Sequence, residues 1–274
     1  MDNKAGRNIR IMGIVNITGD SFFAGSRMLA SDGRLDEAVF RRRVEGMLGE
    51  GADILDFGAC STRPGSESVS EEEEWSRLEP ALRIIARDYP GICLSVDTFR
   101  PGIVRKVHDL VGGFIVNDIS GGCDAMWELL GELKVPYVAM HMRGTPATMS
   151  GLTDYPDGVT AAVMDFFEGI RAKAEEHGVE DWILDPGFGF AKTVEQNWQL
   201  LREMSVFQTF GRPVLAGLSR KSFLYKPLGI TPEEALPATM AANFMALRNG
   251  ADILRVHDVK EARETVRLYG LYMG

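Results

Sequence analysis

Eight short apolar segments recur along the chain, and most of them are separated by segments with the pattern of helices. They are IMGIVNIT (11–18), DILDFG (53–58), CLSVDT (93–98), FIVNDIS (114–120), YVAMHM (137–142), WILDPG (182–187), PVLAGLS (213–219) and DILRVHD (252–258). Apolar segments of this length are typical of strands that are buried on both faces of a parallel sheet. The pattern therefore predicts a repeated strand–helix unit.

Capping residues support the helices between these strands. Thr193 and Gln196 have the spacing of a capping box. Gly51 and Gly250 each open the same pentapeptide, GADIL, which is typical of a helix that ends on glycine just before a strand. Eight strand–helix units in about 250 residues predict a (β/α)8 TIM barrel, with residues 1–274 as a single domain. A doubly wound parallel sheet is the alternative, because periodicity alone does not show that a sheet closes.

Nearly every predicted strand ends in, or is followed by, a residue with binding chemistry, and the amino ends show no such pattern. In chain order these residues are Asn16 and Thr18, Ser61 to Arg63, Asp97, Asn117 and Asp118, Met140 and His141, Asp185, Arg220 and Lys221, and Arg255 and His257. Any one of them alone would be interpreted as a turn former or a helix cap. Together they predict a binding site, because the carboxyl ends of the strands form the active-site rim of a barrel.

Two kinds of chemistry occur on this rim. One group is cationic and suits a phosphate or a carboxylate. It consists of Arg63, Arg220, Lys221, Arg255 and His257. The second group offers acceptors and one amide, which suit a flat heterocycle with an amino group and a ring N–H. It consists of Asp97, Asn117 and Asp185. The rim thus predicts a site for an aromatic heterocycle with a phosphorylated arm, and Asn16 could join the phosphate oxygens in holding Mg²⁺.

Simpler interpretations exist for some of these residues. Asp97 and Asp185 could be N-caps of the helices that follow them. His141 and His257 could be a zinc pair, but no third ligand of matching spacing appears in the sequence.

Composition and charge narrow the class of function. The 274-residue chain has a net charge of −9, which argues against nucleic acid or a membrane surface as a partner. No apolar segment approaches membrane-spanning length, and residues 1–10 are polar, without the pattern of a signal peptide. The three cysteines, Cys60, Cys93 and Cys123, follow no metal-binding spacing. We therefore expect a cytoplasmic protein that acts on small molecules.

Two long loops follow the first two predicted strands. They are GDSFFAGSR (19–27) and ACSTRPGSES (59–68), and both are rich in Gly and Ser and carry cations. Loops of this kind often close over a substrate.

In order and spacing, the motifs resemble those of dihydropteroate synthases along essentially the whole chain. The matching segments are IMGIVNITGDSF, GADILDFGACSTRPGSE, SVDT, NDISGG, MHMRGTP, LDPGFGFAKT, GLSRKSFL and RVHDV. The resemblance implies a (β/α)8 barrel of folate biosynthesis that joins 6-hydroxymethyl-7,8-dihydropterin pyrophosphate to p-aminobenzoate, giving 7,8-dihydropteroate and pyrophosphate. It also implies that sulfonamides compete for the p-aminobenzoate site, that Mg²⁺ takes part, and that the protein forms a homodimer, as the family commonly does.

The same resemblance implies roles for individual residues. The polar edge of the pterin is held by Asp97, Asn117, Asp185 and Lys221, with Met140 and Gly217 against the ring. Arg255 lies over one pterin face and reaches the pyrophosphate. The pyrophosphate is bound by Thr62, Arg63, His257 and, through Mg²⁺, Asn16. The p-aminobenzoate pocket is shaped by Pro64, Phe190, Lys221 and Ser222. The expected catalytic residues are Asp97, Lys221, Arg63, Arg255 and His257.

The chain departs from the family pattern in the two loops. Gly19 stands where proline is usual, Ala24 where an acid is usual, Ser26 where a glycine is usual, and Cys60 where a glutamate is usual. The changes therefore fall on the predicted moving parts, and the residues implied for the pterin are intact.

Three other functions stay open from the sequence. A methyltransferase that acts on methyltetrahydrofolate shares the barrel and the pterin pocket, but it would not need the Ser-Thr-Arg-Pro-Gly and Ser-Arg-Lys-Ser groups present here. A relative that binds pterin without turnover is the second. The third is an aldolase with Lys221 as a Schiff-base lysine, although the flanking Arg220 and Ser222 favour anion binding.

Overall fold

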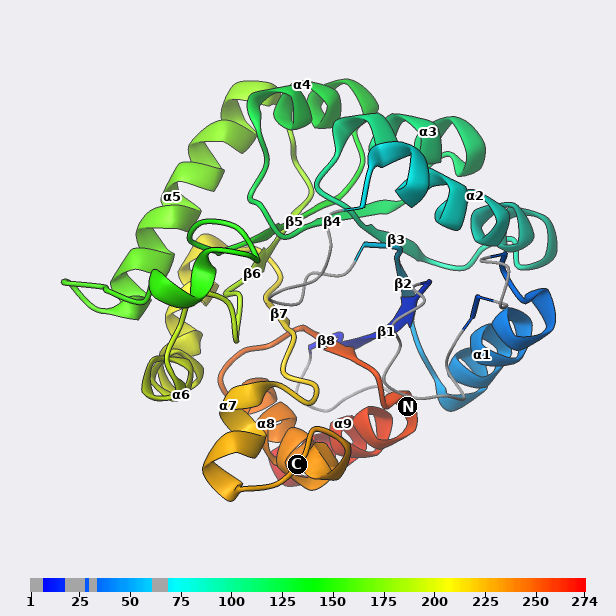
Figure 1. Cartoon of the computed structure of the whole chain (residues 1–274). Helices are drawn as coiled ribbons and strands as arrows, with labels where there is room; N and C mark the ends of the chain where they lie inside the picture. Colours follow the sequence, from blue (N-terminus) through cyan, green and yellow to red (C-terminus); the bar gives the residue numbers. More distant parts are fainter. Residues whose placement is uncertain (1–6, 18–27, 30–33, 61–68) are drawn as a thin grey trace.

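Eight parallel strands surround the centre of the computed structural model, and helices cover their outer side (Figure 1). The structure describes residues 7–17, 28–29, 34–60 and 69–274. The strands are β1 (Arg10–Asn16), β2 (Ile54–Gly58), β3 (Leu94–Asp97), β4 (Ile115–Asp118), β5 (Tyr137–Met140), β6 (Trp182–Asp185), β7 (Leu215–Ala216) and β8 (Ile253–Val256). They are hydrogen-bonded in the order β6-β5-β4-β3-β2-β1-β8-β7. All eight predicted strands are therefore present.

The two ends of this sheet meet, so the sheet is a barrel. Leu184 in β6 and Val214, just before β7, form a parallel bridge. The amide of Leu184 donates to the carbonyl of Pro213 at 2.9 Å. The predicted (β/α)8 architecture is confirmed, and the doubly wound alternative is wrong because such a sheet has two open edges.

Helices follow the strands in regular alternation. They are α1 (Glu37–Glu50), α2 (Glu71–Asp88), α3 (Pro101–Val111), α4 (Asp124–Leu133), α5 (Val159–His177), α6 (Val194–Glu203), α7 (Ser222–Tyr225), α8 (Leu236–Arg248) and α9 (Val259–Met273). Short 3-10 turns occupy Met149–Gly151, Met204–Phe210, Lys226–Leu228 and Glu233–Ala235. Within the described residues, no helix is long and apolar enough to cross a membrane.

The inside of the barrel is filled by one apolar layer, and the functional residues lie directly above it. Seven buried side chains, each from a different strand, make this layer: Met12, Ile54, Ile115, Val138, Ile183, Leu215 and Ile253. Side chains along a strand alternate between the two faces, so residue i+2 points inward as residue i does. Two positions after the last five members of the layer come Asn117, Met140, Asp185, Gly217 and Arg255. Because these rim residues follow the apolar layer by two positions, their side chains also point into the barrel.

The two GADIL segments form the same joint at two places in the barrel. Each has a left-handed glycine at the end of a helix, with φ of 98° and 101°. The aspartate of each segment then accepts a backbone amide near the start of a neighbouring strand. Asp53 accepts from Ile11, the second residue of β1, at 2.7 Å, and Asp252 accepts from Val214, just before β7, at 2.9 Å. The repeated sequence therefore marks a repeated structural unit.

Candidate active site

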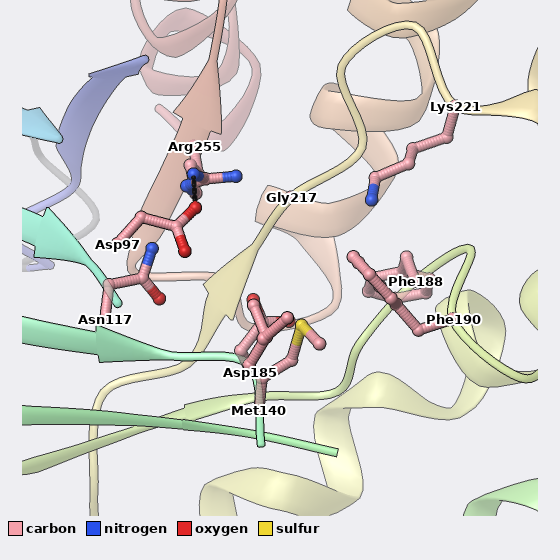
Figure 2. Close-up of a pocket in the computed structure, with 10 residues that line it drawn as sticks. Asp97, Asn117, Met140, Asp185, Phe188, Phe190, Gly217, Lys221 and Arg255 are labelled. Carbon is pink, nitrogen blue, oxygen red and sulfur yellow. Dashed lines mark hydrogen bonds and ion pairs between the residues drawn. The ribbon is translucent and has the colours of Figure 1, made fainter. Parts of the chain in front are cut away.

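One pocket opens at the carboxyl ends of the strands, and it gathers most of the predicted residues (Figure 2). Its lining consists of Asp97, Asn117, Ile119, Met140, Asp185, Phe188, Phe190, Gly217, Lys221 and Arg255. In this view Asp97 and Arg255 lie on one side of Gly217, and Lys221 and Phe190 lie on the other. The pocket thus has a polar, strand-borne side and a side formed by two loops.

Arg255 bridges two carboxylates at the centre of the barrel. Its Nε donates to Asp56 at 2.7 Å, and its Nη2 donates to Asp97 at 2.6 Å. Asp56 is fully buried in the middle of β2 and also accepts from Ser95 Oγ at 2.6 Å. Burial raises the pKa of Asp97 to about 7, although Arg255 opposes this shift. The guanidinium is therefore held in place by groups that belong to the barrel itself.

Asp56 also fixes the orientation of Asn117. The Asn117 Nδ2 donates to Asp56 at 3.1 Å. Because an ionised carboxylate can only accept hydrogen bonds, the amide nitrogen must face Asp56 and the amide oxygen is left for the pocket. Asn117 is therefore presented to a ligand as an acceptor.

Asp185 supplies a further acceptor on the same side. Its Oδ1 accepts from the amide of Gly187 at 2.8 Å, and the side chain is 6% exposed. Burial raises the pKa of Asp185, while the Gly187 amide and the nearby Lys221 lower it. A donor on a ligand would satisfy the remaining oxygen.

Lys221 and Phe190 face each other across the loop side of the pocket. The Nζ of Lys221 lies 4.2 Å from the centre of the Phe190 ring, a cation–π contact. Burial lowers the pKa of Lys221 to about 8, with Asp185 acting in the opposite direction. Lys221 is therefore a donor held against the aromatic wall of the pocket that Asp185 also lines.

Comparison with known proteins identifies the family of the chain. Residues 12–257 match the family model described as pterin binding enzyme. The dihydropteroate synthases of Escherichia coli K12 and of a Synechocystis species are 39% and 40% identical to the chain. Those alignments cover 94% and 93% of this chain and 89% and 87% of the two relatives. The chain belongs to the pterin-binding enzymes, and within them to the dihydropteroate synthases.

Solved structures agree with this family. The structure of the Yersinia pestis dihydropteroate synthase with a sulfonamide drug complex superposes with a TM-score of 0.88 at 32% identity, over 100% of this chain and 96% of that one. The Xanthomonas albilineans dihydropteroate synthase with 4-aminobenzoic acid gives 0.86 at 35% identity, over 98% and 97%. The family implied by the motifs is therefore confirmed.

Three predicted site residues lie near the pocket but do not line it. Asn16 ends β1, and a Cβ added to Gly58 would lie 3.8 Å from its Oδ1 and 3.4 Å from the Cβ of Asp97. Ser222 is the first residue of α7. His257 follows β8, where its Nδ1 lies 3.1 Å from Ser219 Oγ. Burial lowers the pKa of His257 to about 4, and its role toward the pyrophosphate stays a prediction.

The predicted residues of the two loops fall outside the described part of the chain. They are Thr62, Arg63 and Pro64, together with the family departures Gly19, Ala24 and Ser26. Cys60 is described, lies just after β2 and is half-buried, and burial raises the pKa of its thiol.

Arg220 is engaged with the barrel's own groups. Its guanidinium makes two hydrogen bonds with the Asp258 carboxylate, at 2.9 and 3.0 Å. It also donates to the carbonyls of Pro232 and Glu233 at 2.9 and 2.8 Å. These contacts tie the loop after β7 to the start of α9, so the expectation that Arg220 joins the cationic group of the rim is not supported.

The simpler interpretations of the rim residues are wrong. The N-caps of α3 and α6 are Arg100 and Thr193, so neither Asp97 nor Asp185 caps the following helix. The ring of His141 contacts Lys192 at 3.0 Å. Among the described residues, no three His, Cys, Asp or Glu side chains form a group that could hold a metal.

Sequence reasoning missed Ile119, Phe188 and Asp56. The first two are apolar and follow strand ends, so they look like ordinary core residues. Asp56 lies inside the apolar segment DILDFG, where a charged residue between two buried positions is itself a signal. It could have been found by searching for carboxylates within the strands as well as at their ends.

Proposed function

We propose that this synthase joins 6-hydroxymethyl-7,8-dihydropterin pyrophosphate to p-aminobenzoate in the pocket between Asp97 and Phe190. The observation that carries the proposal is the meeting of three acceptors, from Asp97, Asn117 and Asp185, beside an apolar space next to Gly217. A pterin presents an amino group and ring N–H groups along one edge and flat apolar faces above and below. The chemistry of the pocket matches that of the ligand at each of these points.

Lys221 is the donor of this set and faces the acceptor atoms of the pterin edge. Its Nζ also lies against the ring of Phe190, so it stands where the two substrates would meet. We assign Phe190, Lys221 and Ser222, together with Pro64, to the p-aminobenzoate side. Met140 packs against the pterin ring and Arg255 lies over one of its faces.

The reaction needs no nucleophilic side chain. The bond between the pterin methylene and the pyrophosphate oxygen breaks, and the electron pair leaves with the pyrophosphate. Positive charge develops on the methylene and spreads into the ring, where the Asp97 carboxylate stabilises it. The amine nitrogen of p-aminobenzoate then forms the new bond to the methylene and loses a proton to solvent. Arg63, Arg255, Thr62 and His257 stabilise the departing anion.

Asn16 fits a Mg²⁺ that is held mainly by substrate. It is half-buried at the rim beside Gly58, and its amide oxygen is a hard ligand. Mg²⁺ commonly takes one or two protein oxygens and completes its shell with phosphate oxygens and water. When bound, the ion would neutralise charge on the pyrophosphate. The protein residues in this arrangement hold and orient the substrate.

A pyrophosphate-release assay tests the function. We expect release with the pterin pyrophosphate that depends on p-aminobenzoate and on Mg²⁺. A methyltransferase would release none and would instead consume methyltetrahydrofolate. Pterin binding without pyrophosphate release would identify a relative that lacks turnover. The residue changes in the two loops would then be the first candidates for the cause.

We further propose that the synthase forms a homodimer through α8 and α9. Of the seven large apolar side chains exposed among the described residues, five lie on these two helices: Met245, Leu268, Leu271, Tyr272 and Met273. The helices pack together through Phe244, whose ring centre is 5.9 Å from Tyr269 and 5.5 Å from Tyr272. Exposed apolar patches of this kind mark association surfaces.

Light scattering of size-separated protein checks this interface. Leu271, which is 80% exposed, should give a monomer when changed to glutamate. Leu228→Glu is the matched control, because that leucine is 61% exposed and lies outside both helices. A dimer that survives Leu271→Glu but not Leu228→Glu would place the interface elsewhere.

We also propose that residues 1–274 act as one domain in the cytoplasm. The three cysteines are free thiols, which suits a reducing compartment. Cell fractionation with a compartment marker tests the location.

A further inference from the structure

We propose that Lys192 is a positioning residue for the p-aminobenzoate side of the pocket. Its buried amine holds the loop between β6 and α6 against the end of β5, and so places Phe190 opposite Lys221. The inference rests on the proposed function for the identity of the substrate, and on geometry alone for the loop.

The amine of Lys192 is surrounded by polar groups of the loop and of the residue after β5. Its Nζ lies 2.9 Å from the carbonyl of Gly187, 3.0 Å from the carbonyl of Phe190 and 3.0 Å from His141 Nδ1. The residue is only 9% exposed. Among the described residues, no carboxylate forms an ion pair with it. Burying a lysine that binds only neutral groups costs stability, which points to a role in organising those groups.

The backbone of this loop is curled, and the curl directs its carbonyls toward the Lys192 amine. Gly187, Gly189 and Ala191 all have left-handed φ values, of 69°, 79° and 48°. Ala191 is strained in this region because it has a side chain. The resulting curl turns two carbonyls, those of Gly187 and Phe190, toward the same amine. Lys192 donates to both carbonyls, and the Gly187 carbonyl also accepts from the Phe190 amide at 3.1 Å.

The same loop forms the wall of the pocket. Phe188 and Phe190 line it. A Cβ added to Gly189 would lie 3.1 Å from Cδ of Lys221, so the loop backbone also lies along the Lys221 stem. On the β5 side, His141 directly follows Met140, another lining residue. Lys192 therefore contacts both walls through their backbone and His141, and is itself absent from the lining.

Other contacts hold the outer side of the loop. Tyr155 donates from its hydroxyl to the carbonyl of Ala191 at 2.9 Å. Asn197 accepts from the amide of Gly189 at 2.7 Å. The fold should therefore persist when Lys192 is replaced, and the damage should be confined to the inner carbonyls and the pocket wall.

The test compares Lys192→Met with Lys134→Met. Lys134 is a matched control because it also donates to a backbone carbonyl, that of Gly178 at 2.9 Å, and it follows α4, away from the pocket lining. Removing the donor that these two loop carbonyls share should raise KM for p-aminobenzoate about tenfold or more. The dissociation constant of the pterin pyrophosphate should change by less than about threefold, because its acceptors lie on strand ends. Lys134→Met should leave both values unchanged.

Amide hydrogen exchange gives a readout that does not depend on activity. Residues 187–190 should exchange faster in Lys192→Met, whereas β4 and α3 should keep the protection of the unsubstituted protein. If Lys192→Met does not fold, Lys192→Gln keeps one N–H donor group and should show the same local effect in smaller measure.

Two results would overturn the inference. One is unchanged exchange in residues 187–190 of a folded variant. The other is an equal loss for both substrates with faster exchange throughout the barrel, which would make Lys192 a general stability residue. If the protein releases no pyrophosphate at all, the proposed function fails and the exchange experiment still decides the role of Lys192 in the loop.

Discussion

Gly217 leaves open the space that the pterin ring is expected to fill. A Cβ added at this position would meet no atom within 4 Å, and its φ lies outside the left-handed region. We therefore expect Gly217→Ala to fold normally, since glycine-to-alanine changes at compatible sites are neutral or stabilise by about 0.4–1 kcal/mol. The new methyl group would project into the pocket and weaken pterin binding about tenfold or more, as overpacking costs about 1–3 kcal/mol.

Calorimetry with the pterin pyrophosphate, alongside thermal unfolding, checks this prediction. Wild-type affinity in Gly217→Ala would mean that the ring lies elsewhere in the pocket.

Asp185→Asn should weaken pterin binding without unfolding the barrel. One oxygen already accepts from Gly187, so an amide in this position would keep that bond and turn its N–H₂ toward the donors of the pterin. Loss of a charge-assisted bond costs about 1.5–3 kcal/mol. The same titration measures it, and unchanged affinity in a folded variant would remove Asp185 from the binding edge.

The position of a site residue could be predicted where the sequence pattern determines its direction. Asn117, Asp185 and Arg255 each follow an inward apolar residue by two positions, so period-two alternation places them on one rim. The contacts of Arg255 with Asp56 and Asp97 could not be predicted. They depend on how three strands stagger, which a single sequence does not state.

At the scale of elements, capping residues predict the ends of helices, but the sequence does not predict how the backbone inside a loop folds. The capping box of Thr193 and Gln196 is present with both of its hydrogen bonds. The segment GFGFAKT (187–193), which ends on Thr193, is part of the matching motif LDPGFGFAKT and contains the buried Lys192. Nothing in seven residues of loop sequence indicates that a lysine turns inward to meet carbonyls from its own backbone.

Lys192 should also make stability depend on pH. Burial lowers its pKa from 10.5 to about 7. Between these values the unfolded chain binds a proton that the folded chain does not, so this contribution to stability rises with pH above 7 and is flat below it. Relative to Lys192→Met, the free energy of unfolding should therefore increase by about 2 kcal/mol from pH 7 to pH 9.

Urea unfolding of both proteins at the two pH values measures this difference. When neutral, the amine can donate to its two carbonyls and accept from a protonated His141 Nδ1, so the loop contacts persist. Burial lowers the pKa of His141 to about 3, so its own stabilising contribution is lost only as the pH falls below about 6.5. Parallel pH profiles for the two proteins would show that Lys192 keeps an ordinary pKa.

At the scale of the whole molecule, the site has two halves. One half is formed by strand ends of the barrel, and the other is formed by loops. Asp97, Asn117 and Asp185 stand on strand ends, and Asp56 ties Asn117 and Arg255 together in the absence of ligand. The expected p-aminobenzoate side combines Phe190 and Lys221 with Thr62 to Pro64, in a loop that the sequence predicts to be long and rich in Gly and Ser. The first half needs no ligand to form.

We therefore expect ordered binding, with p-aminobenzoate entering after the pterin pyrophosphate. In the ligand-free barrel Arg255 already donates hydrogen bonds to two carboxylates. Its charge is therefore largely neutralised and offers little attraction to the carboxylate of p-aminobenzoate. A bound polyanion would engage Arg63 and offset the cost of ordering its loop, about 1–2 kcal/mol for each residue fixed. We expect the wall that includes Pro64 to be complete only when the polyanion is bound. The coupling must be reciprocal, so p-aminobenzoate should also tighten pyrophosphate binding by the same factor. Titration of p-aminobenzoate into the synthase alone, and then with pyrophosphate and Mg²⁺, measures that factor. Equal affinities in the two titrations would mean that the p-aminobenzoate side is as preformed as the pterin side.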